Sequence, residues 1–307
     1  MFIIQFTLLI VSIFLLWFGA DWMVTAATRI ARRLGVSELI VGLTVVAAGT
    51  SAPELAVSVD AALRGNADIA LGNIIGSNIF NLGLILGMVV LVRSVVTSRN
   101  MVLRDGLMLI VSTVLLLLCL IDGVLTRFEG LLLFSTLAGY IYYLYRQNEP
   151  VDEELAEGNY RWTDSILFLI GLGMVIGGGK LLVDAATYIA YSFGLSEWLV
   201  GVTIVAIGTS APEVVTSLAA ILRRSYGISI GNLIGSDLFN ILGVLGIAAI
   251  ARPLVLETSV FVSFALMAGM AIVIVLMMRS DWRLSRTEGG FLLGMGLARW
   301  ALNLLFF

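Results

Sequence analysis

The sequence predicts an all-α integral membrane protein of ten transmembrane helices, arranged as two inverted five-helix repeats. Three observations lead to this prediction: an apolar composition, ten apolar runs of spanning length, and an internal repeat. Of the 307 residues, 60% are apolar and only 13% are charged, and the mean hydropathy is +1.04. A soluble domain of this length needs far more polar surface, whereas a bilayer tolerates an apolar exterior.

The composition also excludes several classes of function. Histidine is absent and Cys119 is the single cysteine. The chain therefore lacks the usual ligand of zinc, copper and iron sites and the usual base of histidine-dependent catalysis. A single cysteine also excludes a disulfide framework. There is no basic patch typical of nucleic-acid binding, no nucleophile–base pair and no cofactor motif. We expect no enzymatic activity, no cofactor, no nucleic-acid partner and no obligatory protein partner.

Ten apolar runs are each close to the ~20 residues that a spanning helix needs. The first run lacks a basic start and a cleavage-site pattern, so we expect a retained helix rather than a signal peptide. An acidic segment, 147–162, is predicted to be a solvated linker between a first five-helix repeat, 1–146, and a second, 163–307. The predicted spans are 3–27, 38–62, 69–91, 104–121, 128–146, 163–191, 197–221, 228–250, 256–278 and 288–306.

The distribution of arginine predicts the orientation, because cytoplasmic loops carry an excess of basic residues. Three arginines, Arg64, Arg127 and Arg252, fall on one side of the predicted membrane and thirteen fall on the other. The second side is therefore predicted to be cytoplasmic. The linker then lies in the cytoplasm, both termini lie outside, and the chain belongs in an inner (cytoplasmic) membrane. The thirteen are Arg29, Arg32, Arg33, Arg93, Arg99, Arg104, Arg146, Arg161, Arg223, Arg224, Arg279, Arg283 and Arg286.

An internal repeat appears at an offset of 159 residues. GLTVVAAGTSAPE at 42–54 matches GVTIVAIGTSAPE at 201–213 at ten of thirteen positions, and GNIIGSNIFNLGLILG at 72–87 matches GNLIGSDLFNILGVLG at 231–246 at nine of sixteen. Each half holds five predicted spans, an odd number, so equivalent segments cross the membrane in opposite directions. Inverted repeats are typical of alternating-access transporters, whose substrate site lies where the repeats meet. A purely structural duplication would not explain why the most similar stretches are polar.

Two prolines lie inside predicted spans, at equivalent positions in the GTSAPE segments. Pro53 and Pro212 each remove a backbone N–H and are predicted to free the carbonyls of Gly49 and Gly208. In hydrocarbon such a break survives only where it is buried or lines a watery cavity. Freed carbonyls that point into such a cavity are cation ligands.

Polar side chains surround each predicted break. Glu54 and Glu213 follow the prolines, and an intramembrane carboxylate is a functional residue by default. Hydroxyls and amides at a spacing of three or four residues share their helical faces. Carboxylate, hydroxyl, amide and carbonyl oxygens suit hard cations, and Ca²⁺ in particular accepts about 6–8 oxygens in irregular geometry. The predicted ligands are Glu54, Glu213, Thr50, Ser51, Thr209, Ser210, Ser77, Ser236, Asn81 and Asn240.

Other intramembrane groups carry weaker predictions. Asp237 stands where the first half has Asn78, and we expect it to replace one capping group by another, with a third carboxylate ligand as the alternative. Asp21 and Asp60 have no acidic counterpart at the repeat offset and are expected to face a polar cavity or an interface. Glycines of the repeated motifs are expected to let their helices approach closely. These are Gly72, Gly76, Gly231 and Gly235.

At these residues the chain resembles the sodium/calcium exchanger superfamily, of the prokaryotic type. Its two α-repeats carry GTS-x-PE and GN-x-x-GSN-x-x-N patterns, here within 38–91 and 197–250. The resemblance implies a central cluster of cation sites around Glu54 and Glu213, and it adds backbone carbonyl ligands at Ala47 and Ala206. It also implies that Asn240, where some relatives have aspartate, counts against potassium cotransport. The GSD at 235–237 departs from the usual GSN.

The expected function is a cation antiporter that exchanges Na⁺ for Ca²⁺ across a lipid bilayer. Two buried carboxylates left without cations would cost several kcal/mol per ion, so Na⁺ and Ca²⁺ must compete to cover them. An empty carrier should not cross between its two states. The resemblance also implies that spans one and six slide against the rest, and the several glycines of these two spans suit such sliding. A proton-coupled Ca²⁺ antiporter and, from another class, a cation channel remain open as alternatives.

Overall fold

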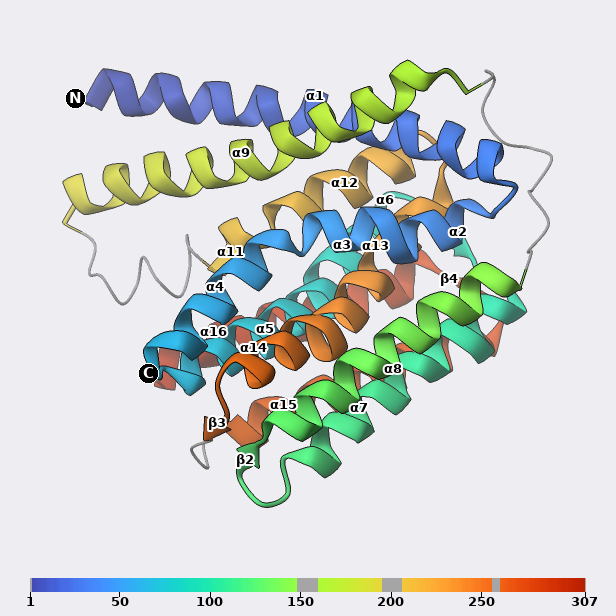
Figure 1. Cartoon of the computed structure of the whole chain (residues 1–307). Coiled ribbons are helices and arrows are strands. Elements are labelled where there is room, and N and C mark those ends of the chain that lie inside the picture. The colour runs from blue at the N-terminus through green and yellow to red at the C-terminus, as the bar shows by residue number, and fades with distance from the viewer. Residues whose placement is uncertain (1, 148–159, 195–205, 256–259, 307) are drawn as a thin grey trace. The chain divides into compact units, whose positions relative to one another are not determined.

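The computed structural model describes residues 2–147, 160–194, 206–255 and 260–306. It is helical apart from four two-residue strands, and the described chain divides into two compact units (Figure 1). Unit 1 comprises Met1–Thr50, Glu149–Asn232 and Ala298–Phe307, and unit 2 comprises Ser51–Asn148 and Leu233–Leu297. Most of the predicted linker, the start of predicted spans seven and nine, and the beginning of the second α-repeat lie outside the described residues.

Long apolar helices agree with the membrane prediction. Among the described residues, six helices are long and apolar enough to cross a membrane, or seven if the interrupted pair Glu38–Thr50 and Ala52–Arg64 counts as one span. Helices occupy the described parts of all ten predicted ranges. Many large apolar side chains are exposed, as suits a lipid-facing surface. The chain is therefore an all-helical, multi-pass membrane protein. The six helices are Phe2–Leu34, Ala67–Val92, Met101–Cys119, Trp162–Ser192, Tyr226–Ala251 and Val262–Ser280.

Unit 1 is built on two long helices, α1 (Phe2–Leu34) and α9 (Trp162–Ser192), which pack along each other (Figure 1). Glycines make the close contact. A Cβ atom built on Gly171 would lie 2.6 Å from the carbonyl oxygen of Gly19, and one built on Gly19 would lie 2.8 Å from the carbonyl oxygen of Gly171. Small residues allow such backbone approach in membranes, where packing replaces hydrophobic driving force. Thus Gly19 and Gly171 join α1 to α9.

Ion pairs add to the packing of α1. Arg29 Nη1 donates to Asp164 Oδ1 of α9 at 2.8 Å, and Asp164 is buried. Asp21 pairs with Arg223, which follows α12 (Ala211–Leu222). Asp21 was expected to face a polar cavity or an interface, and this contact between α1 and the end of α12 is an interface.

The rest of unit 1 consists of the short helices that carry the repeated motifs. The first of these helices, α2 (Glu38–Val41), begins after Ser37. The Ser37 hydroxyl caps it by accepting a hydrogen bond from the Ile40 backbone N–H at 3.3 Å. Gly231 lies in a tight backbone contact there, since a Cβ on Gly231 would be 2.6 Å from the Leu39 carbonyl oxygen and 3.1 Å from the Gly42 Cα atom. These elements are α2, the π-helical turn η1 (Gly42–Val46), α3 (Ala47–Thr50), α11 (Ala206–Thr209), α12 and the first part of α13 (Tyr226–Leu238). The end of α16 (Arg286–Phe306) also belongs to unit 1.

Unit 2 is a bundle of helices joined by two short sheets. Contacts link α4 to α5, α5 to α15, α14 to α4 and α8, and α7 to α8 and α15. Its helices are α4 (Ala52–Arg64), α5 (Ala67–Phe80), α6 (Leu86–Val92), α7 (Leu107–Cys119), α8 (Arg127–Arg146), α14 (Leu245–Ala251) and α15 (Val260–Ser280), with π-helical turns η2 (Asn81–Ile85), η3 (Met101–Gly106) and η5 (Phe239–Val244). The later residues of α13 and most of α16 also belong to it.

The two sheets of unit 2 pair elements from different halves of the sequence. β1 (Val95–Val96) pairs with β4 (Arg283–Leu284), and β2 (Val124–Leu125) pairs with β3 (Leu254–Val255), both antiparallel. At the repeat offset of 159 residues, β1 corresponds to β3 and β2 to β4. Each sheet therefore joins a loop of one repeat to a loop of the other, and the two sheets are equivalent to each other.

A buried polar network joins α8 to the π-helical turn η3, which precedes α7. Asp105 is fully buried and accepts from Arg104 Nε at 2.6 Å and from the Tyr140 hydroxyl at 2.6 Å. Arg104 Nη2 donates to the second carboxylate oxygen at 3.1 Å. Buried charge of this kind is stable only while its hydrogen bonds are complete.

Replacing Tyr140 by phenylalanine is expected to lower the free energy of unfolding by about 1–3 kcal/mol, because a buried carboxylate loses a donor. Thermal unfolding of the detergent-solubilised protein measures this loss. Tyr145→Phe is the matched control, since Tyr145 lies on the same helix and is exposed. Equal unfolding temperatures for the two variants would contradict the structural role of the network.

Candidate cation site

The predicted breaks in the two repeats have the same local structure. α3 ends at Thr50 and α4 begins at Ala52, while α11 ends at Thr209 and α12 begins at Ala211. Ser51 and Ser210 lie between them, with φ/ψ of −78/4° and −88/6°. Pro53 and Pro212 therefore lie in the first turn of a new helix, where the missing N–H costs nothing, instead of inside a continuous kinked helix.

Each of these new helices carries its glutamate in the first turn. Glu54 and Glu213 are each only 1% exposed. The positive end of a helix dipole stabilises a carboxylate at this position. Glu213 belongs to unit 1 and Glu54 to unit 2, so each unit contains one group of candidate ligands.

In unit 1 the hydroxyl of Thr50 is linked to the second repeat. Thr50 Oγ1 donates to Asn232 Oδ1 at 3.0 Å, and Asn232 Nδ2 donates to Ser217 Oγ at 3.0 Å. All three side chains are fully buried. Ala47 and Ser210 are buried as well, and Thr209 is partly exposed. The structure describes Ala206 as the first residue of α11.

In unit 2 the equivalent pair repeats this arrangement. Asn73 Nδ2 donates to Ser58 Oγ at 2.9 Å, and also to the Glu54 carbonyl oxygen at 3.3 Å. Asn73 and Asn232 are separated by the repeat offset, and so are Ser58 and Ser217. Sequence reasoning missed these four residues. Their identity at the repeat offset was the signal that could have found them.

A second polar cluster in unit 2 joins α5 and η2 to α13 and η5. Asn81 Nδ2 donates to Asp237 Oδ1 at 2.9 Å, and Asn240 Nδ2 donates to Asn78 Oδ1 at 2.9 Å. Asn78 Nδ2 also donates to the Asp237 carbonyl oxygen at 3.2 Å. We call Asn78, Asn81, Asp237 and Asn240 the amide cluster. Asn81 and Asn240 lie in π-helical turns, which occur frequently at functional sites.

The predicted serines of unit 2 are also buried. Ser51, Ser77 and Ser236 are at most 5% exposed. Ser51 Oγ has no hydrogen-bond partner within the described residues, nor do Asn81 Oδ1 and Asn240 Oδ1. Unit 2 thus contains several buried oxygens able to accept a cation. No cluster of three or more His, Cys, Asp or Glu residues that could hold a metal occurs in the described parts of the chain.

The glycines of the repeated motifs differ in their surroundings. Gly231 makes the expected close backbone contact in unit 1. A Cβ atom on Gly72 or Gly76 would meet no atom of the described residues within 4 Å, and both glycines are exposed. Close helix approach at these two positions stays a prediction.

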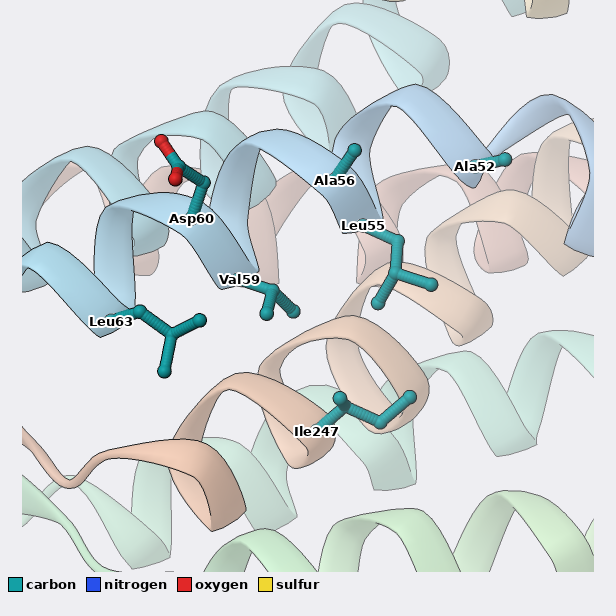
Figure 2. Close-up of a pocket in the computed structure, with 7 residues that line it drawn as sticks. All are labelled: Ala52, Leu55, Ala56, Val59, Asp60, Leu63 and Ile247. Atoms are coloured by element: carbon teal, nitrogen blue, oxygen red, sulfur yellow. The ribbon is translucent and has the colours of Figure 1, made fainter.

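An apolar groove runs along α4 in unit 2, with a volume of about 420 Å³ (Figure 2). Leu55, Val59 and Leu63 point toward Ile247 of α14, and Asp60 lies at the side of the groove. Asp60 forms an exposed ion pair with Arg64 at 2.8 Å, so its charge is balanced without a bound metal ion. The groove offers almost no oxygen ligands, so the candidate cation site lies in the buried polar groups described above.

The fold is that of a multi-pass helical membrane protein, and its two repeated motifs each contain buried, oxygen-bearing side chains. The family model described as sodium/calcium exchanger protein matches residues 4–146 and 164–299. The chain belongs to this family of cation exchangers.

Individual relatives agree with this assignment. The chain is 38% identical over 301 residues to the putative antiporter CaxA of Alkalimonas amylolytica, covering 92% of this chain and 93% of the relative. It is 30% identical over 332 residues to the sodium/calcium exchanger MaX1 of Methanosarcina acetivorans, covering 93% and 94%. The solved structure of the sodium–calcium exchanger NCX_Mj superposes with a TM-score of 0.88 at 31% identity, covering 98% of this chain and 99% of that one.

Proposed function

We propose that the protein exchanges Na⁺ for Ca²⁺ by alternating access, with Na⁺ influx driving Ca²⁺ extrusion. The observation that carries this proposal is the pair of interrupted helices, each with a buried glutamate one turn after the break. The transport site comprises Glu54, Glu213, Thr50, Ser51, Thr209, Ser210, Ser77, Ser236, Asn81, Asn240 and the carbonyls of Ala47 and Ala206. Transported Na⁺ and Ca²⁺ are its ligands, with no cofactor and no catalytic residue.

Electrostatic interactions with the buried glutamates couple the transport of Na⁺ to the transport of Ca²⁺. Removing a carboxylate from water costs several kcal/mol, and a bound cation offsets this cost. One Ca²⁺ and two or more Na⁺ both neutralise the charge of Glu54 and Glu213, so the two ions compete for the same groups. A carrier without either ion retains buried negative charge and does not change state. Because Na⁺ and Ca²⁺ compete for the same groups and the empty carrier does not change state, each transport step in one direction is followed by a step that carries an ion in the other direction. The protein therefore exchanges the two ions and does not leak either one.

Alternating access requires two related halves, and several features support an inverted duplication. The breaks at Ser51 and Ser210 match, and the Asn73–Ser58 and Asn232–Ser217 pairs match. In each of the two sheets, β1–β4 and β2–β3, the arginine distribution also assigns the two joined loops to one side of the membrane. The first sheet falls on the predicted cytoplasmic side and the second on the opposite side. The proposed topology has ten spans, with 1–146 and 163–307 as repeats.

The proposed location follows from the same topology. The protein lies in the inner (cytoplasmic) membrane with both termini extracytoplasmic and the linker 147–162 in the cytoplasm. The α-repeats 38–91 and 197–250 meet near the midplane, where inverted-repeat transporters bind their substrates. Spans one and six, joined through Gly19 and Gly171, move against the remainder.

Uptake of ⁴⁵Ca²⁺ into proteoliposomes tests the proposal. Vesicles loaded with Na⁺ and diluted into choline medium should accumulate Ca²⁺, and vesicles without a Na⁺ gradient should not. In a parallel experiment, ⁴⁵Ca²⁺ uptake is measured in vesicles that have a pH gradient and contain no Na⁺. Uptake that requires only the pH gradient would establish proton-coupled exchange instead, and flux that needs no counter-ion and does not saturate would establish a channel.

A further inference from the structure

The amide cluster has one carboxylate in an otherwise neutral set, and its two halves differ at that point. In the first repeat Asn78 accepts from Asn240 Nδ2 at 2.9 Å, and in the second Asp237 accepts from Asn81 Nδ2 at 2.9 Å. The two hydrogen bonds are equivalent at the repeat offset. An asparagine therefore satisfies this role, and the negative charge of Asp237 is not needed for it.

The surplus oxygen of Asp237 is buried without a partner. Asp237 is 0% exposed, and its Oδ2 atom has no hydrogen bond within the described residues. None of the ion pairs in the described parts of the chain involves Asp237. A buried carboxylate in this state costs several kcal/mol unless a positive charge lies against it.

The same cluster leaves two carbonyl oxygens available. Because an ionised carboxylate only accepts hydrogen bonds, Asp237 requires the amide nitrogen of Asn81 on its own side. Asn81 Oδ1 is consequently turned away from that bond, and it is buried without a hydrogen-bond partner among the described residues, as is Asn240 Oδ1. Three unpartnered oxygens of one hydrogen-bonded cluster, with a single negative charge among them, match a hard monovalent cation in charge and ligand type.

We propose that Asp237, Asn81 and Asn240 form a Na⁺ subsite in unit 2, with Asp237 as the residue that makes it selective for a monovalent ion. This inference rests on the proposed exchange function for its physiological role. It assigns Asp237 as a ligand, in contrast to the expectation that it only replaces a capping group. The carboxylate then lies one helical turn from position 240, inside the same cluster.

Thermal unfolding of the purified full-length protein, titrated with NaCl at constant ionic strength in choline chloride and without Ca²⁺, measures Na⁺ binding independently of transport. Asp237→Asn retains the acceptor that Asn78 provides in the first repeat, so the fold should persist. We expect the Na⁺ concentration for half-maximal stabilisation to rise at least about tenfold, because a unit charge is lost at a poorly solvated site. Equilibrium ⁴⁵Ca²⁺ binding without Na⁺ should change less than about threefold.

Three further proteins make the test specific. The double variant Asp237→Asn/Asn240→Asp keeps one carboxylate in the cluster and should restore the Na⁺ response. Asp237→Glu retains the charge and serves if Asp237→Asn does not fold. Asp60→Asn is the control, because Asp60 is exposed and paired with Arg64.

The outcomes separate the subsite from the exchange function. An unchanged Na⁺ titration in Asp237→Asn overturns the subsite, and so does an equal loss of Na⁺ and Ca²⁺ binding. Stabilisation of the wild type by KCl as effective as that by NaCl overturns the assignment to Na⁺. Asp237-dependent Na⁺ binding in a protein that shows no Na⁺-driven Ca²⁺ uptake would support the subsite and overturn the proposed exchange.

Discussion

Glu54→Gln and Glu213→Gln are each expected to lower Ca²⁺ affinity by about a hundredfold or more and to abolish Na⁺-driven Ca²⁺ uptake. At an effective dielectric constant of about 20, two unit charges 4 Å apart interact by about 4 kcal/mol, and a divalent ion interacts about twice as strongly. A loss of about 2.8 kcal/mol is already a hundredfold change. Both glutamates are 1% exposed, so water screens little of this interaction.

The substitution changes charge without changing shape. Glutamine has nearly the volume of glutamate and keeps one acceptor oxygen, so packing around the first turn of α4 or α12 is preserved. Asp60→Asn is the matched control for Glu54→Gln, because both residues lie on α4 and Asp60 is exposed. We expect the control to transport at the wild-type rate.

Two measurements separate binding from translocation. Equilibrium ⁴⁵Ca²⁺ binding reports affinity, and uptake into proteoliposomes reports exchange. The two variants should behave alike because their residues occupy equivalent positions in the two repeats. Wild-type uptake in both variants would refute the assignment of these carboxylates, and loss in only one would refute their equivalence.

Gly171→Ala is expected to destabilise the protein by about 1–3 kcal/mol, the usual cost of overpacking a tight contact. The added methyl group would lie 2.6 Å from the carbonyl oxygen of Gly19 and 2.8 Å from the backbone nitrogen of Met23. Backbone atoms cannot rotate away as a flexible side chain can, so α1 and α9 must separate. A shift of the unfolding temperature measured in detergent is the direct readout.

Gly173→Ala is the matched control on the same helix. A methyl group there would meet no atom of the described residues within 4 Å. Alanine also favours a helix over glycine by up to about 1 kcal/mol, so this variant should be as stable as the wild type or slightly more stable. Gly19→Ala alters the same contact from α1, and the double variant should cost less than the sum of the single variants. Equal unfolding temperatures for Gly171→Ala and Gly173→Ala would show that the glycine contact does not hold α1 to α9.

The sequence alone determined the membrane class, the family and the position of both helix breaks. Each of these depends on properties that act over one or two turns: apolar length, proline, and polar residues that recur at a fixed offset. The residues of the candidate site could be proposed for the same reason, since a carboxylate such as Glu54 is costly in an apolar run and is retained there for a function, and their role in binding cations stays a prediction. The orientation of the termini and the choice of coupling ion stay predictions.

Only the tertiary structure decided which polar groups meet. The bonds from Asn232 to Thr50 and Ser217, and from Asn81 to Asp237, join residues that are 15 to 182 positions apart. Such bonds depend on how helices are rotated and shifted against one another, which no local pattern encodes. In a membrane this register is set by small residues and polar contacts rather than by hydrophobic burial. For that reason the packing of Gly171 against Gly19, and the Asp237 oxygen that has no hydrogen-bond partner among the described residues, were visible only in the folded chain.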